Sequence, residues 1–431
     1  MAAPLLSTRR FLPLFLTQAL GALNDNLFKS ALVVLIAFRD ESGGAALVAL
    51  AGGLFILPYL LVSATAGQLA DRFEKTRLIR LTKLFEVALM LMAAAGLLSD
   101  NVGLMLAVLF GLGVQAAAFG PLKYGILPER LGADELLRGN ALVEAGTFAA
   151  ILVGTIAGGA LIGLTNGPAL VAGAGIAVAV AGLLAALAIP VGEPAAPSLA
   201  IDRNPAVATW RLVRAARLNR PVWVALLALS WFWTLGATYL AQFPVLAKVE
   251  FAADNRIVTL LLASFTAGIG MGSLLVGRLA GSREAGSLAP VAAGLLTLFT
   301  WGFAALVSLP AASAWHEPAA MATSLPGLAA LLCLVGAAAC GGVYSVPLYA
   351  ILQRRAPRAE RARVVAANNV MNAVFMVLGS VVIAVIARAG WRPAVILGIA
   401  GALNAAAGLA LRRALRTGPV EAGAKLGHEQ V

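Results

Sequence analysis

The chain has 431 residues, of which 61% are hydrophobic and only 12% are charged, and its mean hydropathy is +0.90. These values exclude an ordinary soluble globular protein and indicate a polytopic membrane protein. The net charge of +12 comes with no recognisable nucleic-acid-reading motif, so we expect no nucleic-acid partner. Short cytoplasmic loops are usually rich in Lys and Arg, and we interpret the charge as a sign of topology and of contact with anionic membrane lipids.

Apolar stretches separated by short polar breaks run along the whole chain. An α-helix of about 20 residues crosses ~30 Å of hydrocarbon, whereas the strands of a membrane barrel are about half as long and alternate. We therefore predict an all-α polytopic membrane protein with about twelve spans. In chain order they cover residues 11–38, 45–70, 78–98, 103–124, 141–164, 168–190, 222–247, 257–280, 288–309, 325–352, 364–387 and 393–411.

The first span carries the polar run Asn24-Asp25-Asn26, with Lys29 one helical turn further on. A charge at bilayer depth is costly, and it usually serves an ion, a proton or a polar substrate. Two interpretations stay open: Asp25 acts on the substrate or the gate, or Lys29 simply neutralises it at spacing i,i+4. The span follows Arg9-Arg10 and is long enough to be retained rather than cleaved as a signal peptide.

A polar loop follows the second span, and it contains the run Gly67-Gln68-Leu69-Ala70-Asp71-Arg72-Phe73-Glu74-Lys75-Thr76-Arg77. Glycine permits close helix approach, and a carboxylate can accept hydrogen bonds from a helix N-terminus. The run resembles the G-x-x-x-D-R-x-G-R-R loop of the major facilitator superfamily, which steadies one conformation of the gate. The resemblance implies a gating role for Gly67, Asp71, Arg72, Lys75 and Arg77.

This loop departs from the superfamily pattern because Glu74 replaces the second glycine. A related run in the second half of the chain has Gly281 where Asp71 stands. We therefore expect a charge-dependent contact that closes the gate to differ between the two halves. Such repeats predict two pseudo-symmetric six-helix bundles that rock about a site near the membrane midplane. The predicted boundaries are 1–192 for the first bundle, 193–220 for a cytoplasmic linker, 221–412 for the second bundle and 413–431 for a cytoplasmic tail.

Further charged residues lie in or near the third, fourth and fifth spans. Lys83 and Glu86 are expected to be local partners at spacing i,i+3. Lys123 either serves the site or extends to the inner membrane surface, and Glu144 is a candidate gate partner for it. In the seventh span, Trp233 is more often a packing or interface residue than a ligand contact, and both interpretations stay open.

Three runs carry a narrower resemblance: Gly21 to Lys29, Phe119 to Glu129, and Trp231-Phe232-Trp233 through Gln242-Phe243-Pro244. They resemble the bacterial lysophospholipid transporter family, LplT. The resemblance covers essentially the whole chain. It implies movement of lysophospholipids, chiefly lysophosphatidylethanolamine, across the bacterial inner membrane for reacylation on the cytoplasmic side. We expect the acyltransferase to be a separate protein and the transporter to be a monomer with both termini in the cytoplasm.

A zwitterionic lysolipid needs a carboxylate for its ammonium group, a cation and hydrogen-bond donors for its phosphate, and an apolar surface for its tail. Asp25 with its flanking amides suits the ammonium, and Lys123 suits the phosphate. Leu240, the repeat-related counterpart of Asp25, carries no charge, so we expect a site biased to the first bundle. The predicted substrate-binding residues are Asn24, Asp25, Asn26, Lys29, Gln115, Lys123, Tyr124, Trp233, Tyr239 and Gln242.

A second function stays open, namely a proton-coupled exporter of amphiphilic drugs or other small solutes with Asp25 as the proton carrier. An enzyme is not expected, because no nucleophile and base stand together in the spans. Cys333 and Cys340 lie seven residues apart on one predicted helix, about 10 Å, which is too far for a disulfide. His316 and His428 lie outside the spans, so we expect no metal and no cofactor.

Overall fold

The computed structural model describes residues 4–39, 44–253, 255–280 and 285–416. Within these ranges, 12 helices are long and apolar enough to cross a membrane, and no strand is present. The predicted all-α membrane fold is therefore confirmed. The helices are α1 (Leu12–Arg39), α2 (Gly44–Arg72), α3 (Lys75–Leu98), α4 (Val102–Arg130), α5 (Leu136–Ile162), α6 (Gly167–Leu187), α8 (Arg220–Val249), α9 (Asn255–Ala280), α10 (Leu288–Val307), α12 (Leu325–Arg355), α13 (Arg361–Arg388) and α14 (Pro393–Arg416).

Several helices extend beyond the predicted spans. The helix α4 continues to Arg130 instead of ending near residue 124, and α5 begins at Leu136 instead of near 141. Hydropathy detects only the part of a helix that lies in hydrocarbon, whereas backbone hydrogen bonding continues past the interface. The predicted bounds were therefore too short at these ends.

Two shorter helices were not predicted: α7 (Pro205–Leu218) in the linker and α11 (Pro318–Thr323) between α10 and α12. The side chain of Asn204 caps α7 by accepting the backbone N–H groups of Ala206 and Val207, and Pro205 occupies the first turn, where its missing N–H is not needed. The amphipathic α7 buries Leu212 between small residues and turns its arginines outward. Its low hydropathy hid it among the linker residues.

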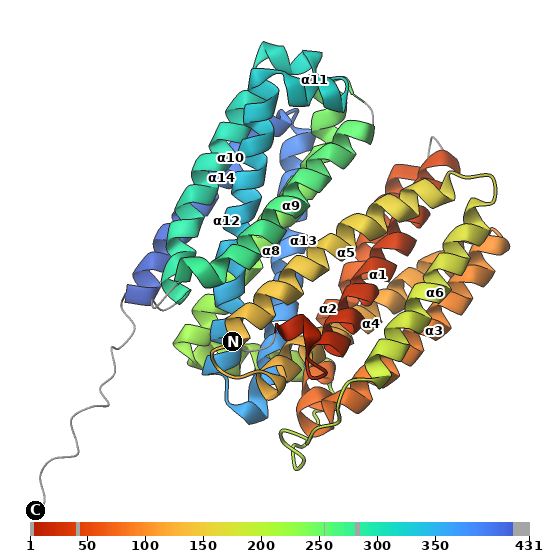
Figure 1. Cartoon of the computed structure of the whole chain (residues 1–431), viewed down its shortest axis with the longest axis vertical. Helices are drawn as coiled ribbons and strands as arrows, with labels where there is room; N and C mark the ends of the chain where they lie inside the picture. Colours follow the sequence, from red (N-terminus) through yellow and green to blue (C-terminus); the bar gives the residue numbers. More distant parts are fainter. Residues whose placement is uncertain (1–3, 40–43, 254, 281–284, 417–431) are drawn as a thin grey trace, which may run out of the picture.

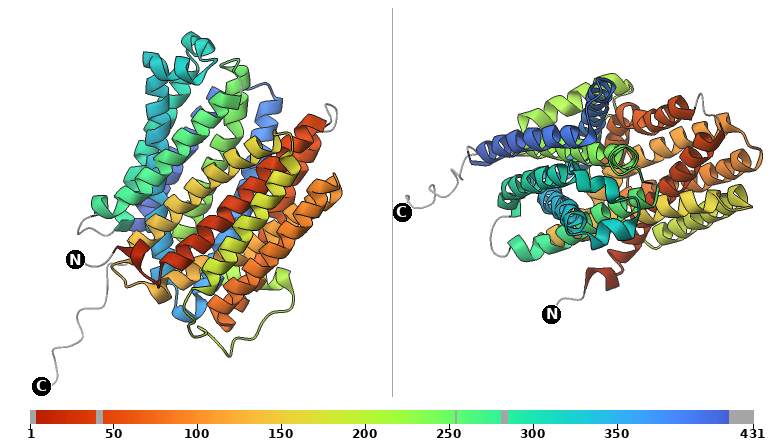
Figure 2. Two further views of the ribbon diagram at one scale, coloured as in Figure 1. Left: turned by 45° about the vertical axis from the view of Figure 1, so that its right-hand side comes forward. Right: turned by 90° about the horizontal axis from the view of Figure 1, so that it is seen from above.

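The membrane helices form two six-helix bundles, as predicted (Figures 1 and 2). In the first bundle α1 packs on α5 and α6, α2 packs on α4, and α3 packs on α4 and α6. In the second, α12 packs on α8, α9 and α10, and α14 packs on α8 and α10. The exact bundle boundaries stay a prediction, and residues 417–431 of the predicted tail lie outside the described residues.

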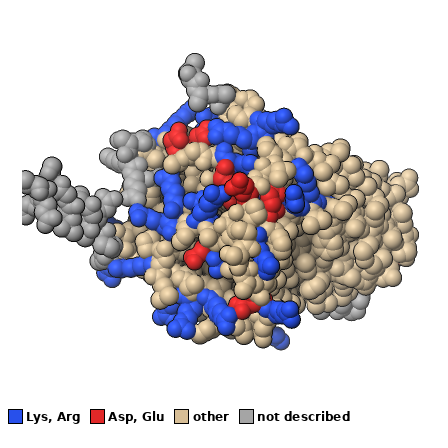
Figure 3. All heavy atoms as spheres, turned by 90° about the horizontal axis from the view of Figure 1, so that it is seen from below, with Lys and Arg blue, Asp and Glu red and all other residues tan. Residues whose placement is uncertain are grey.

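The bundles meet at one end and diverge toward the other (Figures 1 and 2). The end where they meet carries the α2–α3, α4–α5 and α12–α13 connections and the linker, and Lys and Arg side chains crowd its surface (Figure 3). We call it the basic end. There α13 packs on α2 and α4, and a Cβ placed on Gly67 would lie 2.6 Å from the Cβ of Ala366. The glycine thus allows the close approach expected from the sequence.

Candidate functional site

Asp25 lies in the interior of α1 and is buried, and its Oδ1 atom makes no hydrogen bond. Its two neighbours are engaged elsewhere. Asn24 donates through Nδ2 to Glu86 Oε1 at 3.1 Å, and Asn26 donates to the carbonyl of Ala22 at 2.8 Å. Buried carboxylates are normally paired or fully hydrogen-bonded. An unsatisfied carboxylate oxygen inside a membrane helix is therefore the strongest sign of a binding site in this bundle.

Lys29 does not form an ion pair with Asp25 in the described part of the chain. Its Nζ atom lies 5.2 Å from the centroid of the Phe55 ring on α2, a cation–π distance. The direct pair between Asp25 and Lys29 that the spacing allowed is thus not made in this conformation. Lys29 still stands one turn from the carboxylate.

A buried polar cluster supports the Asn24–Asp25 segment from α3 and α4. Lys83 and Glu86 form the expected ion pair, and both side chains are completely buried. Glu86 also accepts from Asn24 and, at 2.9 Å, from Gln115 Nε2. A buried ion pair needs such extra bonds because desolvation of both charges is costly. Gln115, predicted to bind the substrate, donates instead to Glu86 within the bundle.

Tyr124 and Glu144 join the first bundle to the second near the basic end. Tyr124 stacks on Tyr349 of α12 with ring centroids 4.3 Å apart, and its hydroxyl donates to Glu144 at 3.3 Å. The same carboxylate accepts from Ser345 of α12 at 3.3 Å. Glu144 therefore binds across the interface, consistent with a place in a gate.

The predicted Lys123–Glu144 ion pair is not formed among the described residues. The Nζ atom of Lys123 lies 4.6 Å from the centroid of the Tyr124 ring, and the hydroxyl of the same tyrosine donates to the Glu144 carboxylate. The hydrogen bonds of Glu144 to the two hydroxyl groups take the place of the pair. Sequence spacing could not reveal this, because the tyrosine stack depends on a helix from the other bundle.

The three candidates on α8 face different surroundings. Trp233 stacks on Phe148 of α5 with centroids 6.0 Å apart and donates to the Tyr349 hydroxyl at 2.9 Å, so it lies between the bundles. Gln242 is buried, and its Oε1 atom makes no hydrogen bond. Tyr239 points into the second bundle and donates to Thr300 at 2.8 Å. Because of this bond, the Tyr239 hydroxyl does not face the first bundle.

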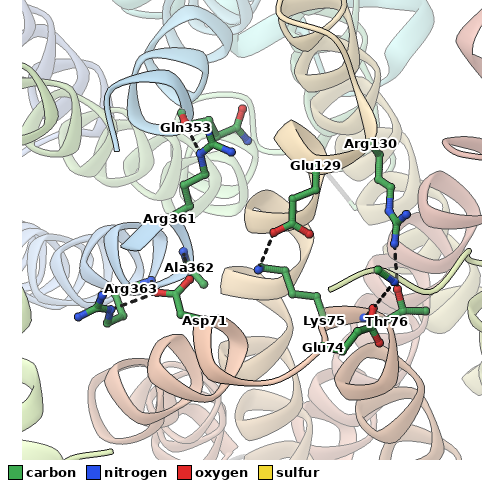
Figure 4. A network of polar contacts seen from close by, with 11 residues as sticks. Asp71, Glu74, Lys75, Thr76, Glu129, Arg130, Gln353, Arg361, Ala362 and Arg363 are labelled. Atoms are coloured by element: carbon green, nitrogen blue, oxygen red, sulfur yellow. Dashed lines mark hydrogen bonds and ion pairs between the residues drawn. The ribbon is translucent and has the colours of Figure 1, made fainter. Parts of the chain in front are cut away.

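Asp71 caps the start of α13 (Figure 4). Its carboxylate accepts the backbone N–H groups of Ala362 at 3.0 Å and Arg363 at 3.2 Å, and the Arg363 guanidinium at 3.1 Å. These contacts confirm that Asp71 binds a helix N-terminus, where the free N–H groups and the helix dipole favour a negative charge. Because α2 and α13 belong to different bundles, the contact ties the bundles together.

The other loop residues act within the first bundle. Lys75 is buried and pairs with Glu129 at 2.7 Å (Figure 4). Arg72 lies with its guanidinium carbon 5.5 Å from the centroid of the Phe73 ring, and the Arg77 side chain is exposed. These positions anchor the loop at the basic end without crossing to the second bundle.

Glu74, the departure from the superfamily loop, is the N-cap of α3. It accepts the backbone N–H groups of Thr76, Arg77 and Gly192 at 2.9, 2.7 and 3.0 Å. Burial by itself would raise the pKa of this carboxyl, but the three backbone donors outweigh it and hold the pKa below its usual value. The replacement of glycine therefore fixes the loop and the start of the linker to α3.

A reciprocal amide pair at the basic end was not found from the sequence. Asn140 of α5 donates to Gln353 of α12 at 2.6 Å, and Gln353 donates back at 3.1 Å and to the Tyr124 carbonyl at 3.1 Å. Both side chains are buried. Two amides 213 positions apart give no periodic or motif signal, so only the fold brings them together. We call Asn140 and Gln353 the amide pair.

The described ranges contain no cluster of three or more His, Cys, Asp or Glu side chains that could hold a metal ion. Cys333 and Cys340 are free thiols on α12. His316 contacts the Phe251 carbonyl at 2.9 Å through Nδ1, and His428 lies outside the described residues. The polar groups of this site are therefore carboxylate, ammonium, amide and hydroxyl.

Residues 14–316 match the family model of the Major Facilitator Superfamily. The lysophospholipid transporter LplT of Escherichia fergusonii is 31% identical over 391 residues, covering 86% of this chain and 87% of the relative. LplT of Serratia proteamaculans is 32% identical over 362 residues, covering 82% of each chain.

Two solved structures share the fold at low identity. The human organic anion transporter MFSD10 has a TM-score of 0.74 at 15% identity, covering 94% of this chain and 99% of its own. The transporter FucP in the outward conformation has a TM-score of 0.70 at 13% identity, covering 94% and 99%. With a superfamily model and relatives matched along most of its length, the chain belongs to the Major Facilitator Superfamily and, within it, to the LplT lysophospholipid transporter family.

Proposed function

We propose that this protein moves lysophospholipids from the outer to the inner leaflet of a bacterial inner membrane by alternating access. The observation that carries the proposal is the buried Asp25 carboxylate, which has an oxygen without a hydrogen-bond partner inside a membrane-spanning helix. A positively charged ligand group would supply the missing partner. The ammonium of a phosphoethanolamine head group has that charge and three donors.

The lipid phosphate contacts Lys123 at a later stage of transport than the ammonium contacts Asp25. With a rise of 1.5 Å per residue, Asp25 lies roughly 20 Å from the start of α1 and Lys123 roughly 10 Å from the end of α4, both measured from the basic end. One head group therefore meets Asp25 first and Lys123 nearer the basic end. Asn24 and Asn26 flank the first contact, while Tyr124 and Trp233 flank the second.

The basic end forms the inner gate in this proposal. Asp71 at the start of α13, the amide pair and the Glu144–Ser345 contact hold it closed. Because each joins the two bundles, all must break for a head group to leave toward that side. Gly67 and the ion-paired Lys75 support the gate through close packing and loop anchoring.

The orientation follows from charge. Lys and Arg gather on the basic end (Figure 3), and the positive-inside rule places that end and both termini in the cytoplasm. Lysolipid delivered there becomes the substrate of a separate acyltransferase, whose consumption of product drives net inward movement. We propose that the transporter acts as a monomer and has no enzymatic activity of its own.

The test uses proteoliposomes with labelled lysophosphatidylethanolamine. We expect Asp25→Asn to reduce uptake at least about tenfold, since charge-assisted hydrogen bonds contribute about 1.5–3 kcal/mol. Asp202→Asn is the matched control, because Asp202 pairs with Arg211 in the linker and should leave uptake unchanged. A lysolipid without an ammonium group should be much less sensitive to Asp25→Asn.

The outcomes separate this function from proton-coupled export of amphiphilic solutes. Uptake that persists without a proton gradient supports downhill lipid movement. Uptake that requires the gradient rejects the downhill mechanism. Dye efflux without any lipid movement rejects the lipid assignment.

A further inference from the structure

A cavity lies at the basic end, apart from the Asp25 site. Its volume is about 320 Å³, at the lower end of the range for ligand pockets. Leu137 at the start of α5 forms one wall, and Gly286 of the short helix η2 (Ala285–Ser287) and one face of α12 form the rest. The α12 residues that line the cavity are Pro347, Ala350, Ile351, Arg354 and Arg355.

The cavity has a polarity along its length. The five α12 residues follow the i, i+3, i+4, i+7, i+8 pattern, so they form a single stripe over about 12 Å of helix. Pro347 and Ala350 at the inner part are apolar and buried, whereas Arg354 and Arg355 at the outer part are exposed on the basic end. A phospholipid in the adjoining leaflet has the same polarity, with its charge at the surface and its chains inward.

The charges favour a net negative occupant. Two arginines line the cavity, and the lining residues within the described ranges include no carboxylate. Arg354 spends one donor on the Ala133 carbonyl of the α4–α5 connection, and a guanidinium has five donors that suit the fork of phosphate oxygens. The described residues that line the cavity offer no carboxylate to the ammonium of a zwitterionic head group. The shared chemistry is a phosphoester anion, and the apolar stripe points to a lipid as its source.

We propose that this cavity binds the phosphate of an anionic glycerophospholipid through Arg354 and Arg355, with the glycerol and upper chain segments against Leu137, Pro347 and Ile351. Leu137 belongs to the first bundle and the α12 residues to the second. A lipid in the cavity therefore contacts both bundles and stabilises the arrangement in which they meet at the basic end. Anionic lipid acts here as a bound regulator, separate from the transported substrate.

The experiment is a lipid-binding titration of the full chain in detergent, followed by native mass spectrometry. The probes are phosphatidylglycerol, zwitterionic phosphatidylethanolamine and soluble glycerol 3-phosphate. We expect one phosphatidylglycerol to bind at least about tenfold more tightly than the other two. The double variant Arg354→Ala/Arg355→Ala should lose that preference, and Gly286→Leu should weaken binding by filling the cavity without removing charge.

The matched control is Arg217→Ala/Arg412→Ala, which removes the same charge from exposed positions outside the cavity and should bind like the native chain. Equal losses in both double variants would mean that overall surface charge attracts the lipid, and would overturn the proposal. Glycerol 3-phosphate binding as tightly as the lipid would overturn the lipid assignment. Unchanged binding in Gly286→Leu would place the lipid elsewhere. Binding is measured without transport, so none of these outcomes depends on the proposed lysolipid activity.

Discussion

Replacing Gln353 by Leu should shift the equilibrium between the closed and the parted basic end. Leucine keeps much of the volume of Gln353 but removes three hydrogen bonds that join the bundles, at 2.6, 3.1 and 3.1 Å. In the parted state water replaces these partners, so the net value of about 1 kcal/mol per bond applies. The closed state should lose about 3 kcal/mol, which is roughly a 100-fold change in the equilibrium.

Spin labels at Arg138 of α5 and Arg412 of α14, in a chain with both cysteines replaced by serine, would report the distance between bundles at the basic end. The native side chains at both positions are exposed. We expect Gln353→Leu to move most of the distance distribution to a longer value, and Asn140→Leu to do nearly the same. The double variant should add little to either, because both members serve one set of bonds.

Asn404→Leu is the matched control. Asn404 is also a buried amide with three hydrogen bonds, to Trp231, Ala293 and Thr297, but all of them lie inside the second bundle. This variant should lower the thermal unfolding midpoint without changing the distance distribution. If Asn404→Leu parts the bundles as strongly as Gln353→Leu does, or if Gln353→Leu leaves the distances unchanged, the amide pair is not a gate contact.

Three further predictions concern packing, buried charge and pH. Gly67→Val should also lengthen the distance across the basic end, because its Cβ would lie 2.6 Å from that of Ala366 and 3.1 Å from a backbone oxygen; Gly236→Val, with open space around the Cβ, should not. Glu86→Gln should lower the free energy of unfolding by about 3–5 kcal/mol, whereas Lys83→Leu/Glu86→Leu should be less harmful; equal losses in both variants, measured by thermal unfolding, would contradict this. Glu74→Gln should lower the free energy of unfolding at pH 7. The folded pKa of Glu74 lies below its usual value of 4.5, so the difference in unfolding free energy between the variant and the native chain should shrink as the pH falls through that region. A difference that grows on acidification would be inconsistent with the capping role.

The fold was predictable because the bilayer imposes strong periodic constraints. A helix must satisfy its own backbone and expose about 20 apolar residues, so length and hydropathy located every membrane helix. The same constraint explains the errors. The amphipathic α7 and the final turns of α4 and α12 carry too many polar residues for hydropathy to register them.

The candidate site was only partly predictable. Local partners on one helix, such as Lys83 and Glu86, follow from spacing, and Asp71 follows from a loop with a physical role at a helix N-terminus. The partners of Gln115, Tyr124 and Glu144 come from other helices, so spacing along one helix could not identify them. The direction of Tyr239 was also hidden, because only the packing of the second bundle determines which face of α8 turns inward.

The distribution of charge between the bundles suits repeated opening and closing. The first bundle buries the Lys83–Glu86 ion pair with added amide partners, and all of these bonds lie within that bundle. Across the interface, the amide pair and the Glu144–Ser345 contact use hydrogen bonds whose net contribution is modest. Breaking a buried ion pair would cost several kcal/mol in each cycle. The ion pair of Asp71 with Arg363 also joins the bundles, and its arginine is partly exposed, so water can replace the partner when the bundles part. In the gate that we propose, several weak contacts can hold the basic end closed at rest and can still be broken with the binding free energy of one lipid head group.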